Sequence, residues 1–255
     1  MPEETNVKRQ LVVGLVSLAW LFTNASVTRA ATLFTDSFDA ANNPLLEGYD
    51  RFTVGSGVIR RDGQFADVND RAYMRTVDTD YNGIDFDYRL TFTTQPLSQT
   101  SINFIGIGFG DRRPGGQFAH NEPYNSLYLR IHAPSVINGE VGIGNAPASS
   151  FAILGNIPVG GRHEFLLRKR GFSMEFAIDA NFDGTFLADM SYVVDDYRTV
   201  APFLDNTQSR LFFGTVFAND SFDNLRITIP EPSTGVMAGI ACGLLCSLRK
   251  RFKNP

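Results

Sequence analysis

The chain has 255 residues and a net charge of −4, with 23 Lys and Arg against 27 Asp and Glu. Residues 31–229 are more acidic than the whole, because they hold only 16 of the basic residues but 24 of the acidic ones. Nucleic acids and anionic membrane surfaces are bound by positively charged protein surfaces. The composition therefore argues against nucleic acid as a partner, whereas it is compatible with divalent cations.

The first 30 residues have the pattern of a secretory signal peptide. Two basic residues precede an apolar run at 11–22, and small residues follow this run. As a helix the run would be ~18 Å long, which is too short to cross a hydrocarbon core of ~30 Å. We therefore expect residues 1–30 to be removed by cleavage between Ala30 and Ala31, and the remainder to be exported.

The segment between the two ends, residues 31–229, is predicted to form one all-β domain. Apolar and polar residues alternate along most of it, which is typical of strands that bury one face. The clearest runs are 86–92, 105–109, 127–131, 165–178 and 225–229. Gly, Pro, Asn and Asp separate these runs, and no long amphipathic helix interrupts them. We expect an antiparallel sandwich of two sheets, with a hairpin turn at 169–171.

Cysteine is not expected to stabilise this domain. The two cysteines, Cys242 and Cys246, both lie in the apolar run near the carboxy terminus. An oxidising compartment therefore adds no disulfide to residues 31–229, and burial must hold their core together. The single tryptophan, Trp20, lies in the predicted signal peptide, so Phe and Tyr supply the aromatic side chains of the domain.

Three stretches of the domain carry a resemblance to a known family. They are the opening TDSFDAANNPLLEGY, the hairpin GRHEFLLRKRGFSMEFAID and the closing SRLFFGTVFANDSFDNLRITI. In these stretches the chain resembles the concanavalin A-like lectin and glucanase (laminin G-like) family. The resemblance implies a jelly-roll sandwich in which the first and last strands are neighbours. Another β-sandwich with jelly-roll connectivity is the alternative.

The segment DANFDGTFLAD, residues 179–189, has the spacing of a calcium-binding loop. Asp179, Asn181 and Asp183 alternate before a glycine at the sixth position, and Asp189 follows. Alternating oxygen ligands around a sharp turn suit Ca²⁺. The loop departs from an EF-hand because strands flank it and its twelfth residue is not Glu. The alternative is a turn whose Asp and Asn side chains bind their own backbone.

One strand face offers a second candidate site, for a sugar. Tyr128, Arg130 and His132 share one side of the run at 126–133. A tyrosine ring beside two polar side chains could lie under a sugar, which presents an apolar face and a rim of hydroxyls. The alternative is an ordinary solvated face.

No recognisable catalytic motif is present in residues 31–229. Retaining glucanases of the family that the chain resembles carry a strand motif ExDxxE, which places paired carboxylates on one face of the sheet. The five glutamates of the domain do not form this motif, and there is no Gly-x-Ser-x-Gly elbow or histidine pair at metal spacing. We therefore expect the protein not to be an enzyme.

A Pro-Glu-Pro triplet, an apolar run and a basic cluster follow one another at the carboxy terminus. They comprise Pro230, Glu231 and Pro232, the segment 235–248, and Arg249, Lys250 and Arg251. The short apolar run and its basic flank predict a weak single transmembrane helix. Residues 230–253 resemble the PEP-CTERM sorting signal of Gram-negative bacteria. The resemblance implies recognition by an exosortase, cleavage near the Pro-Glu-Pro motif, and delivery to the cell surface or an exopolysaccharide matrix.

These features together predict an exported, non-catalytic surface or matrix protein with a glycan-binding or structural role. Its expected partners are an exosortase, the membrane through the carboxy-terminal segment, and exopolysaccharide or another glycan. Two alternatives stay open. Analogy with fold relatives favours a polysaccharide-active, glycoside hydrolase-like enzyme. An acidic surface and a calcium loop favour a calcium-dependent adhesion module.

Overall fold

A computed structural model describes most of the predicted domain. The described residues are 31–39, 42–49, 52–55, 57–61, 72–78, 80–94, 103–110, 126–133, 138–144, 149–158, 160–206, 209–215 and 221–230. Among them, Thr32–Ile229 form one compact unit, called here the body. The predicted signal peptide lies outside the described residues, and so does the predicted sorting segment except for Pro230.

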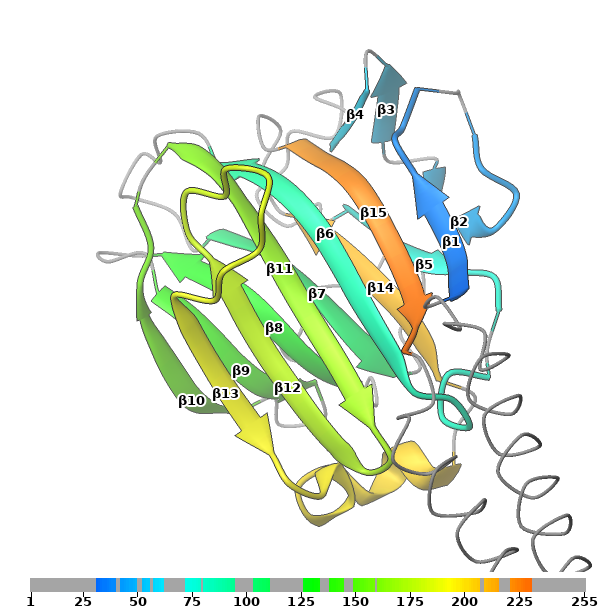
Figure 1. Ribbon diagram of the computed structural model, residues 1–255, viewed down its shortest axis with the longest axis vertical. Helices are drawn as coiled ribbons and strands as arrows, with labels where there is room; N and C mark the ends of the chain where they lie inside the picture. The colour runs from blue at the N-terminus through cyan, green and yellow to red at the C-terminus, as the bar shows by residue number, and fades with distance from the viewer. Residues whose placement is uncertain are drawn as a thin grey trace, which may run out of the picture. The chain divides into compact units, whose positions relative to one another are not determined.

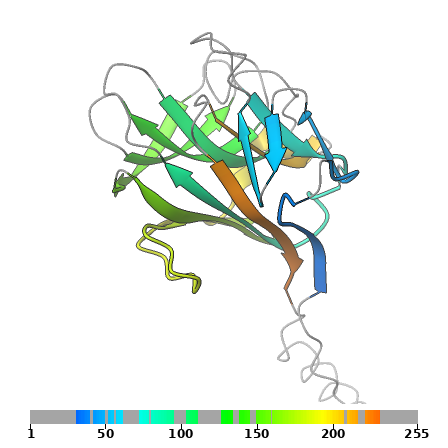
Figure 2. The ribbon, with the colours of Figure 1, turned by 90° about the horizontal axis from the view of Figure 1, so that it is seen from above.

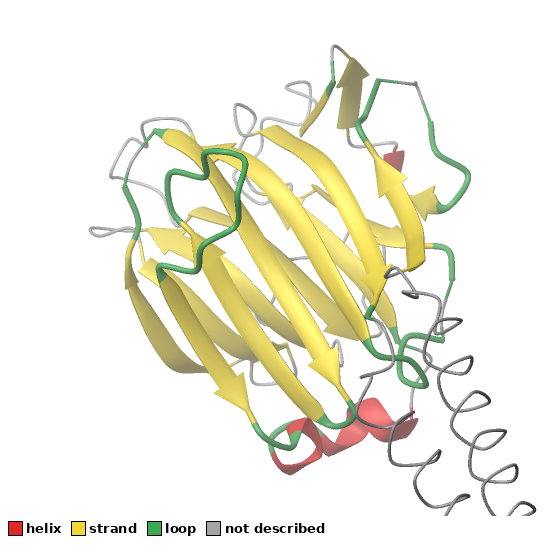
Figure 3. Cartoon of the chain, viewed as in Figure 1, coloured by secondary structure: helices red, strands yellow, loops and turns green. Residues whose placement is uncertain are grey.

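The described body is built from β-strands, as the alternating sequence predicts (Figure 1, Figure 3). Its helical turns include two short 3-10 helices, η2 (Tyr197–Thr199) and η3 (Pro202–Asn206). In the described part of the chain, none of the helices combines the length and the apolar composition needed to cross a membrane.

The strands form two sheets that lie one over the other (Figure 1, Figure 2). The first sheet has the order β13-β12-β11-β6-β15-β4-β3, and β1 also pairs with β15. The second has the order β10-β9-β8-β7-β14-β5-β2. The first-sheet strands are β1 (Ala31–Asp36), β3 (Phe52–Gly55), β4 (Val58–Arg61), β6 (Phe86–Thr94), β11 (Gly161–Arg170), β12 (Ser173–Asp179), β13 (Met190–Val194) and β15 (Ser221–Ile229). The second-sheet strands are β2 (Leu46–Glu47), β5 (Ala72–Thr76), β7 (Asn103–Gly110), β8 (Ser126–Ala133), β9 (Asn138–Gly144), β10 (Ser149–Asn156) and β14 (Arg210–Thr215).

The core lies between the two sheets and is largely aromatic. Alternate residues of β6 are fully buried there, and Phe86 of this strand packs against Phe109 of β7 with ring centroids 5.8 Å apart. Phe213 of β14 and Phe222 of β15 meet edge to face, with ring centroids 4.9 Å apart. Each such strand buries one face against the opposite sheet. The predicted all-β sandwich with antiparallel sheets is therefore confirmed.

The first and last strands of the body are neighbours, as predicted. β1 pairs with β15, and Figure 1 shows the start of β1 beside the end of β15. The centre of the sheet thus combines segments from distant parts of the sequence, because β15 also pairs with β6. This pairing is what brings residues near 36 and near 224 to one surface.

The predicted hairpin is confirmed, but its turn lies further along the chain than expected. Arg170 pairs with Ser173, so β11 continues to Arg170 and only Gly171 and Phe172 form the turn. Gly171 has a φ of 56°, a conformation that glycine adopts without steric cost. Lys169, expected in the turn, is instead buried on β11 and donates to the carbonyl oxygen of Ile84 at 3.0 Å. Two-residue turns fit the twist of antiparallel strands, which favours the shorter loop.

Candidate functional site

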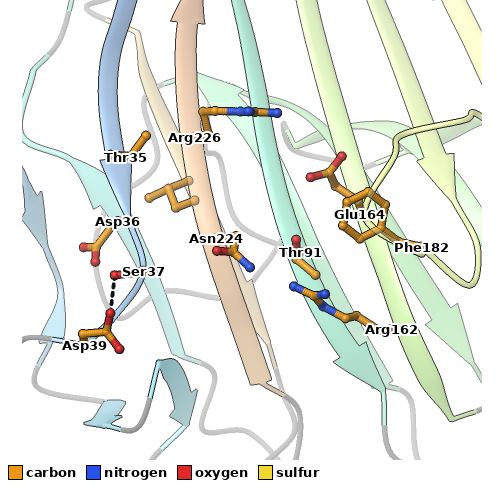
Figure 4. A pocket seen from close by; sticks show the side chains of 12 residues that line it. Thr35, Asp36, Ser37, Asp39, Thr91, Arg162, Glu164, Phe182, Asn224 and Arg226 are labelled. Atoms are coloured by element: carbon orange, nitrogen blue, oxygen red, sulfur yellow. Dashed lines mark hydrogen bonds between the residues drawn. The ribbon is translucent and has the colours of Figure 1, made fainter.

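A hollow of about 600 Å³ lies on the outer face of the first sheet (Figure 4). Strands β6, β11 and β15 form its floor. One wall, called here the β1 wall, consists of residues 35–39, and the other, the loop wall, belongs to residues 180–189 between β12 and β13. The lining residues are Thr35, Asp36, Ser37, Asp39, Thr91, Arg162, Glu164, Phe182, Gly184, Asn224, Leu225 and Arg226.

The floor is polar because strand alternation turns these side chains away from the core. Thr91 of β6 lies opposite Glu164 of β11 on one side and Asp223 of β15 on the other. The Thr91 side chain is only 1% exposed, and its hydroxyl has no hydrogen-bond partner in the described structure. An unpaired buried hydroxyl costs free energy, so Thr91 leaves an unsatisfied polar group in the floor of the hollow.

Ion pairs cross the floor from strand to strand. Nη1 of Arg89 lies 3.5 Å from a carboxylate oxygen of Glu164, and Nη2 of Arg162 lies 3.2 Å from one of Asp223. Burial raises the pKa of the Glu164 carboxyl, and the nearby guanidinium groups of Arg89 and Arg226 offset part of that rise. The floor therefore presents fixed charges of both signs.

The loop wall is held over the sheet by hydrogen bonds to its own backbone. A carboxylate oxygen of Asp179 accepts from the Leu187 N–H at 2.7 Å, and one of Asp189 accepts from the Ala180 N–H at 2.8 Å. These bonds place the ring of Phe182 at the hollow, where the Arg162 guanidinium lies 5.5 Å from its centroid. An aromatic ring and a polar floor thus face the same space.

The β1 wall supplies carboxylates. Asp36 accepts from the N–H of Phe38 at 2.7 Å, and Asp39 accepts from the hydroxyl of Ser37 at 2.7 Å. Phe38 adopts a positive φ of 55° and is buried against Phe213, with ring centroids 6.0 Å apart. The buried ring anchors the bend at which the chain turns along the hollow.

The predicted calcium loop is thus part of this hollow, but its side chains are engaged as in the turn alternative. In addition to the two aspartates above, Asp183 accepts from the Thr185 N–H at 3.0 Å, and Asn181 adopts a φ of 67°. Over the described ranges, no group of three or more His, Cys, Asp or Glu residues is arranged to hold a metal ion. Calcium binding by Asp179, Asn181, Asp183 and Asp189 stays a prediction.

The predicted sugar face of β8 lies on the other sheet and is not exposed. Tyr128 is 1% and Arg130 is 5% exposed, and the Arg130 guanidinium lies 5.0 Å from the centroid of the Tyr128 ring. The side chain of His132 lies outside the described residues. The structure therefore does not bring these residues to the hollow, and their binding role stays a prediction.

Of the residues predicted for signal-peptide cleavage and for sorting, the structure describes only Ala31 and Pro230. Ala31 begins β1, and Pro230 directly follows β15. The remaining residues of these predictions, Ala30, Glu231, Pro232, Arg249, Lys250 and Arg251, lie outside the described residues.

A short repeat could have revealed the hollow from the sequence. The tetrapeptide Asp-Ser-Phe-Asp occurs at 36–39 and again at 220–223. The two phenylalanines, Phe38 and Phe222, both pack on Phe213; the first copy lines the hollow, and the second directly precedes the lining residue Asn224. Floor residues from β6 and β11 carry no such signal, because they follow ordinary strand alternation.

His163, at the base of the loop wall, is predicted to make the stability of the body depend on pH. It is fully buried, its ring lies tilted beside Phe92 with centroids 5.2 Å apart, and its Nδ1 accepts from the Asn181 N–H at 3.1 Å. Burial lowers the pKa of His163 below its ordinary value of 6.5. The unfolded chain then binds more protons, so stability is full above about pH 6.5 and falls as the pH drops toward the lowered pKa.

The measurement is urea unfolding from pH 7.5 to 5 for the wild type and for His163→Gln, which keeps an acceptor but does not titrate. We expect the wild type to lose more unfolding free energy than the variant across this range. The remaining carboxylates and histidines are common to both proteins, so the difference isolates His163. Parallel stability curves would show that its protonation does not oppose folding.

The comparisons with known proteins concern the fold of the body. No protein-family model matches the chain, and no curated protein matches it in sequence. Several solved structures are similar. The metal-free exoplasmic/lumenal domain of VIP36 has a TM-score of 0.56 at 8% identity, covering 80% of this chain and 95% of that one. The acidic lectin of winged bean, complexed with methyl-α-D-galactose, has a TM-score of 0.51 at 11% identity, covering 78% of this chain and 97% of that one.

A third similar structure is the CBM2 module of the evolved Dit protein of Lactobacillus casei BL23 phage J-1, with a TM-score of 0.51 at 10% identity. The match covers 80% of this chain and 98% of that module. Identities this low establish similarity of fold and leave the ligand open. The body thus has the concanavalin A-like, two-sheet sandwich that these lectin and carbohydrate-binding domains share.

Proposed function

We propose that the body is a non-catalytic carbohydrate-binding module and that the hollow is its sugar site. The observation that carries this proposal is the pairing of an aromatic ring, Phe182, with a floor and wall of polar side chains. Sugars present an apolar ring face together with hydroxyls, so they need both kinds of contact. The volume of about 600 Å³ lies within the usual range for small-molecule sites.

Similar solved structures support the proposal. VIP36 is known in a form bound to Ca²⁺ and Man3GlcNAc, with a TM-score of 0.54 to this chain, and the winged bean lectin in complex with methyl-α-D-galactose. Within the hollow, Asn224 and the carboxylates of Asp36 and Asp39 would accept hydrogen bonds from sugar hydroxyls. Phe182 would lie against the apolar face of the sugar ring.

We further propose that the module is exported and sorted. Its signal peptide would be removed after Ala30, and an exosortase would recognise the PEP-CTERM signal at 230–253. The mature body would then reach the cell surface or the exopolysaccharide matrix of a Gram-negative bacterium, where it would bind glycan. The end of the last strand suits this route, because β15 ends at Ile229, directly before the Pro-Glu-Pro motif.

The proposal is tested by a glycan array with the purified protein, followed by calorimetric titration of the glycans that bind. Phe182→Ala should weaken binding about tenfold, on the order of 1.4 kcal/mol, because the ring lines the hollow. The substitution should leave the fold intact, since Phe182 does not belong to the hydrophobic core cluster. Phe172→Ala is the matched control, since Phe172 is 48% exposed in the β11–β12 turn and does not line the hollow. Equal losses in both variants, or no glycan bound at all, would refute the hollow as the site.

The same protein separates the two other functional classes. Running the array with and without Ca²⁺ tests the adhesion alternative, because a calcium-dependent module loses binding when the cation is removed. Incubation with a polysaccharide panel tests the enzymatic alternative by the release of reducing sugar. Turnover that survives purification would overturn the non-catalytic proposal.

A further inference from the structure

The arginines around the hollow differ in whether a carboxylate lies close to them. On β6, β11 and β15, the described arginines Arg89, Arg162, Arg168 and Arg170 each lie within 4.0 Å of a carboxylate oxygen. Among the described arginines of these three strands, Arg226 alone has no such partner, and its side chain is exposed. Its position at the hollow therefore leaves one guanidinium available to a ligand.

The register of the sheet places this cation beside another one. Arg226 of β15 lies directly opposite Arg89 of β6. Like charges at directly opposite positions destabilise an antiparallel pair. Glu164 lies 3.5 Å from Arg89 and also interacts electrostatically with Arg226, so one carboxylate serves both arginines. A carboxylate brought by a ligand would give Arg226 the direct ion pair that the other arginines of these strands already have.

Figure 4 shows that Arg226 and the carboxylates of the β1 wall lie on different sides of the hollow. The side chain of Arg226 extends from β15 across β6, away from Asp36 and Asp39 on the β1 wall. One side of the hollow therefore offers a guanidinium, and the other offers carboxylates, which accept hydrogen bonds but repel an anion. Thr91, two residues from Arg89 on the same face of β6, adds a buried hydroxyl without a partner in the described structure.

We infer that the hollow binds an acidic sugar, a hexuronate, with the sugar carboxylate on Arg226. This inference rests on the proposed carbohydrate-binding function and names the class of sugar. The guanidinium group forms paired hydrogen bonds with a carboxylate. The hydroxyls on the opposite edge of the sugar ring would then donate to Asp36 and Asp39, and its apolar face would lie against Phe182. A neutral sugar could form the hydrogen bonds to the β1 wall and pack against Phe182, but it would give Arg226 no carboxylate to pair with.

The overall charge of the body does not prevent this contact. Residues 31–229 hold more acidic than basic residues, and an acidic polymer is repelled at long range. Charges further apart than ~8 Å are largely screened at physiological salt, whereas a direct guanidinium–carboxylate contact is screened much less. The local arrangement at Arg226 therefore decides which sugar is preferred.

The test is calorimetric titration of the purified protein with matched oligosaccharides at physiological salt. The probes are short oligomers of glucuronate, galacturonate, mannuronate and guluronate, each paired with its neutral, carboxyl-reduced counterpart. Each pair differs only in the group that Arg226 is inferred to bind. We expect at least one acidic oligomer to bind about tenfold or more tightly than its neutral counterpart.

Substitutions then assign the preference to one side chain. Arg226→Gln should abolish the preference for the acidic oligomer and retain binding of the neutral one, whereas Arg226→Lys should retain part of the preference because it keeps the charge. Arg60→Gln is the matched control, since Arg60 is exposed on β4 of the same sheet, does not line the hollow, and should leave both affinities unchanged. Thermal unfolding checks that each variant is folded.

The outcomes separate this inference from the proposed function. Binding of neutral and acidic oligomers with equal affinity, or preference for the neutral ones, would overturn the hexuronate inference and leave carbohydrate binding standing. A preference that survives Arg226→Gln would overturn the role of Arg226. Failure of every acidic and neutral glycan to bind would overturn both proposals.

Discussion

Replacing Gly106 of β7 with alanine is expected to destabilise the body by about 3 kcal/mol or more. An ideal Cβ on this residue would lie 2.4 Å from the carbonyl oxygen of Leu129 and 2.8 Å from the Cα of Arg130. Both atoms belong to the backbone of the neighbouring strand β8, so no side-chain rotation can relieve the clash. Either β7 and β8 separate or the pairing shifts, and both changes expose core.

The effect is measured by thermal and urea unfolding. For a domain of this size, 3 kcal/mol lowers the Tm by on the order of 10 °C. Gly55→Ala is the matched control, because nothing lies within 4 Å of an ideal Cβ at Gly55, which also sits on a strand. The control should change stability by less than about 0.5 kcal/mol. Equal stability of the two variants would mean that β7 and β8 do not approach as closely as the structure shows.

Replacing Phe92 with alanine is expected to cost about 3–5 kcal/mol, the usual range for truncating a buried aromatic side chain. Phe92 is 0% exposed and stacks on Phe165 of β11 with ring centroids 4.0 Å apart and an interplanar angle of 17°. It also lies beside the ring of His163. Truncation would leave a cavity beneath the floor of the hollow, where Thr91 and Glu164 flank these core residues in sequence.

Urea unfolding of Phe92→Ala, with Phe172→Ala as the control, measures this cost. Both changes remove the same atoms, but Phe172 is 48% exposed in a turn, so its loss should cost about 1 kcal/mol or less. Glycan affinity should fall with Phe92→Ala only as far as the folded fraction falls, because Phe92 faces the core. A small loss for Phe92→Ala would show that the site can collapse around the missing ring or that its packing is loose.

These two predictions concern different properties of the sandwich. Gly106 tests how closely two strands of one sheet approach, and Phe92 tests how the first sheet fills the core. The hollow lies on the far side of that sheet, built on paired strands rather than on long loops. A site whose floor is made of paired strands is held rigidly, which reduces the ordering cost of binding.

The alternation of apolar and polar residues was sufficient to predict an all-β body and its two-sheet packing. Phe86, Tyr88, Leu90 and Phe92 show why, since a period of two places all four on the buried face of β6 whatever the partner strands are. At residues 179–189 the observed side-chain contacts are those of the turn alternative, which local chemistry predicts. The side chains there bind backbone groups two to nine residues away, within the loop and its edges.

Exposure and the composition of the site were decided by tertiary structure alone. Tyr128 and Arg130 alternate away from the core as expected, yet they are buried, and His163 is buried beside Phe92 although histidine is a polar residue. The hollow combines β1, β6, β11, β15 and a loop, segments whose neighbours are set by long-range strand pairing. Alternation tells which face of a strand a residue occupies, but not which strand lies beside it, and the position of Arg226 opposite Arg89 depends on that pairing.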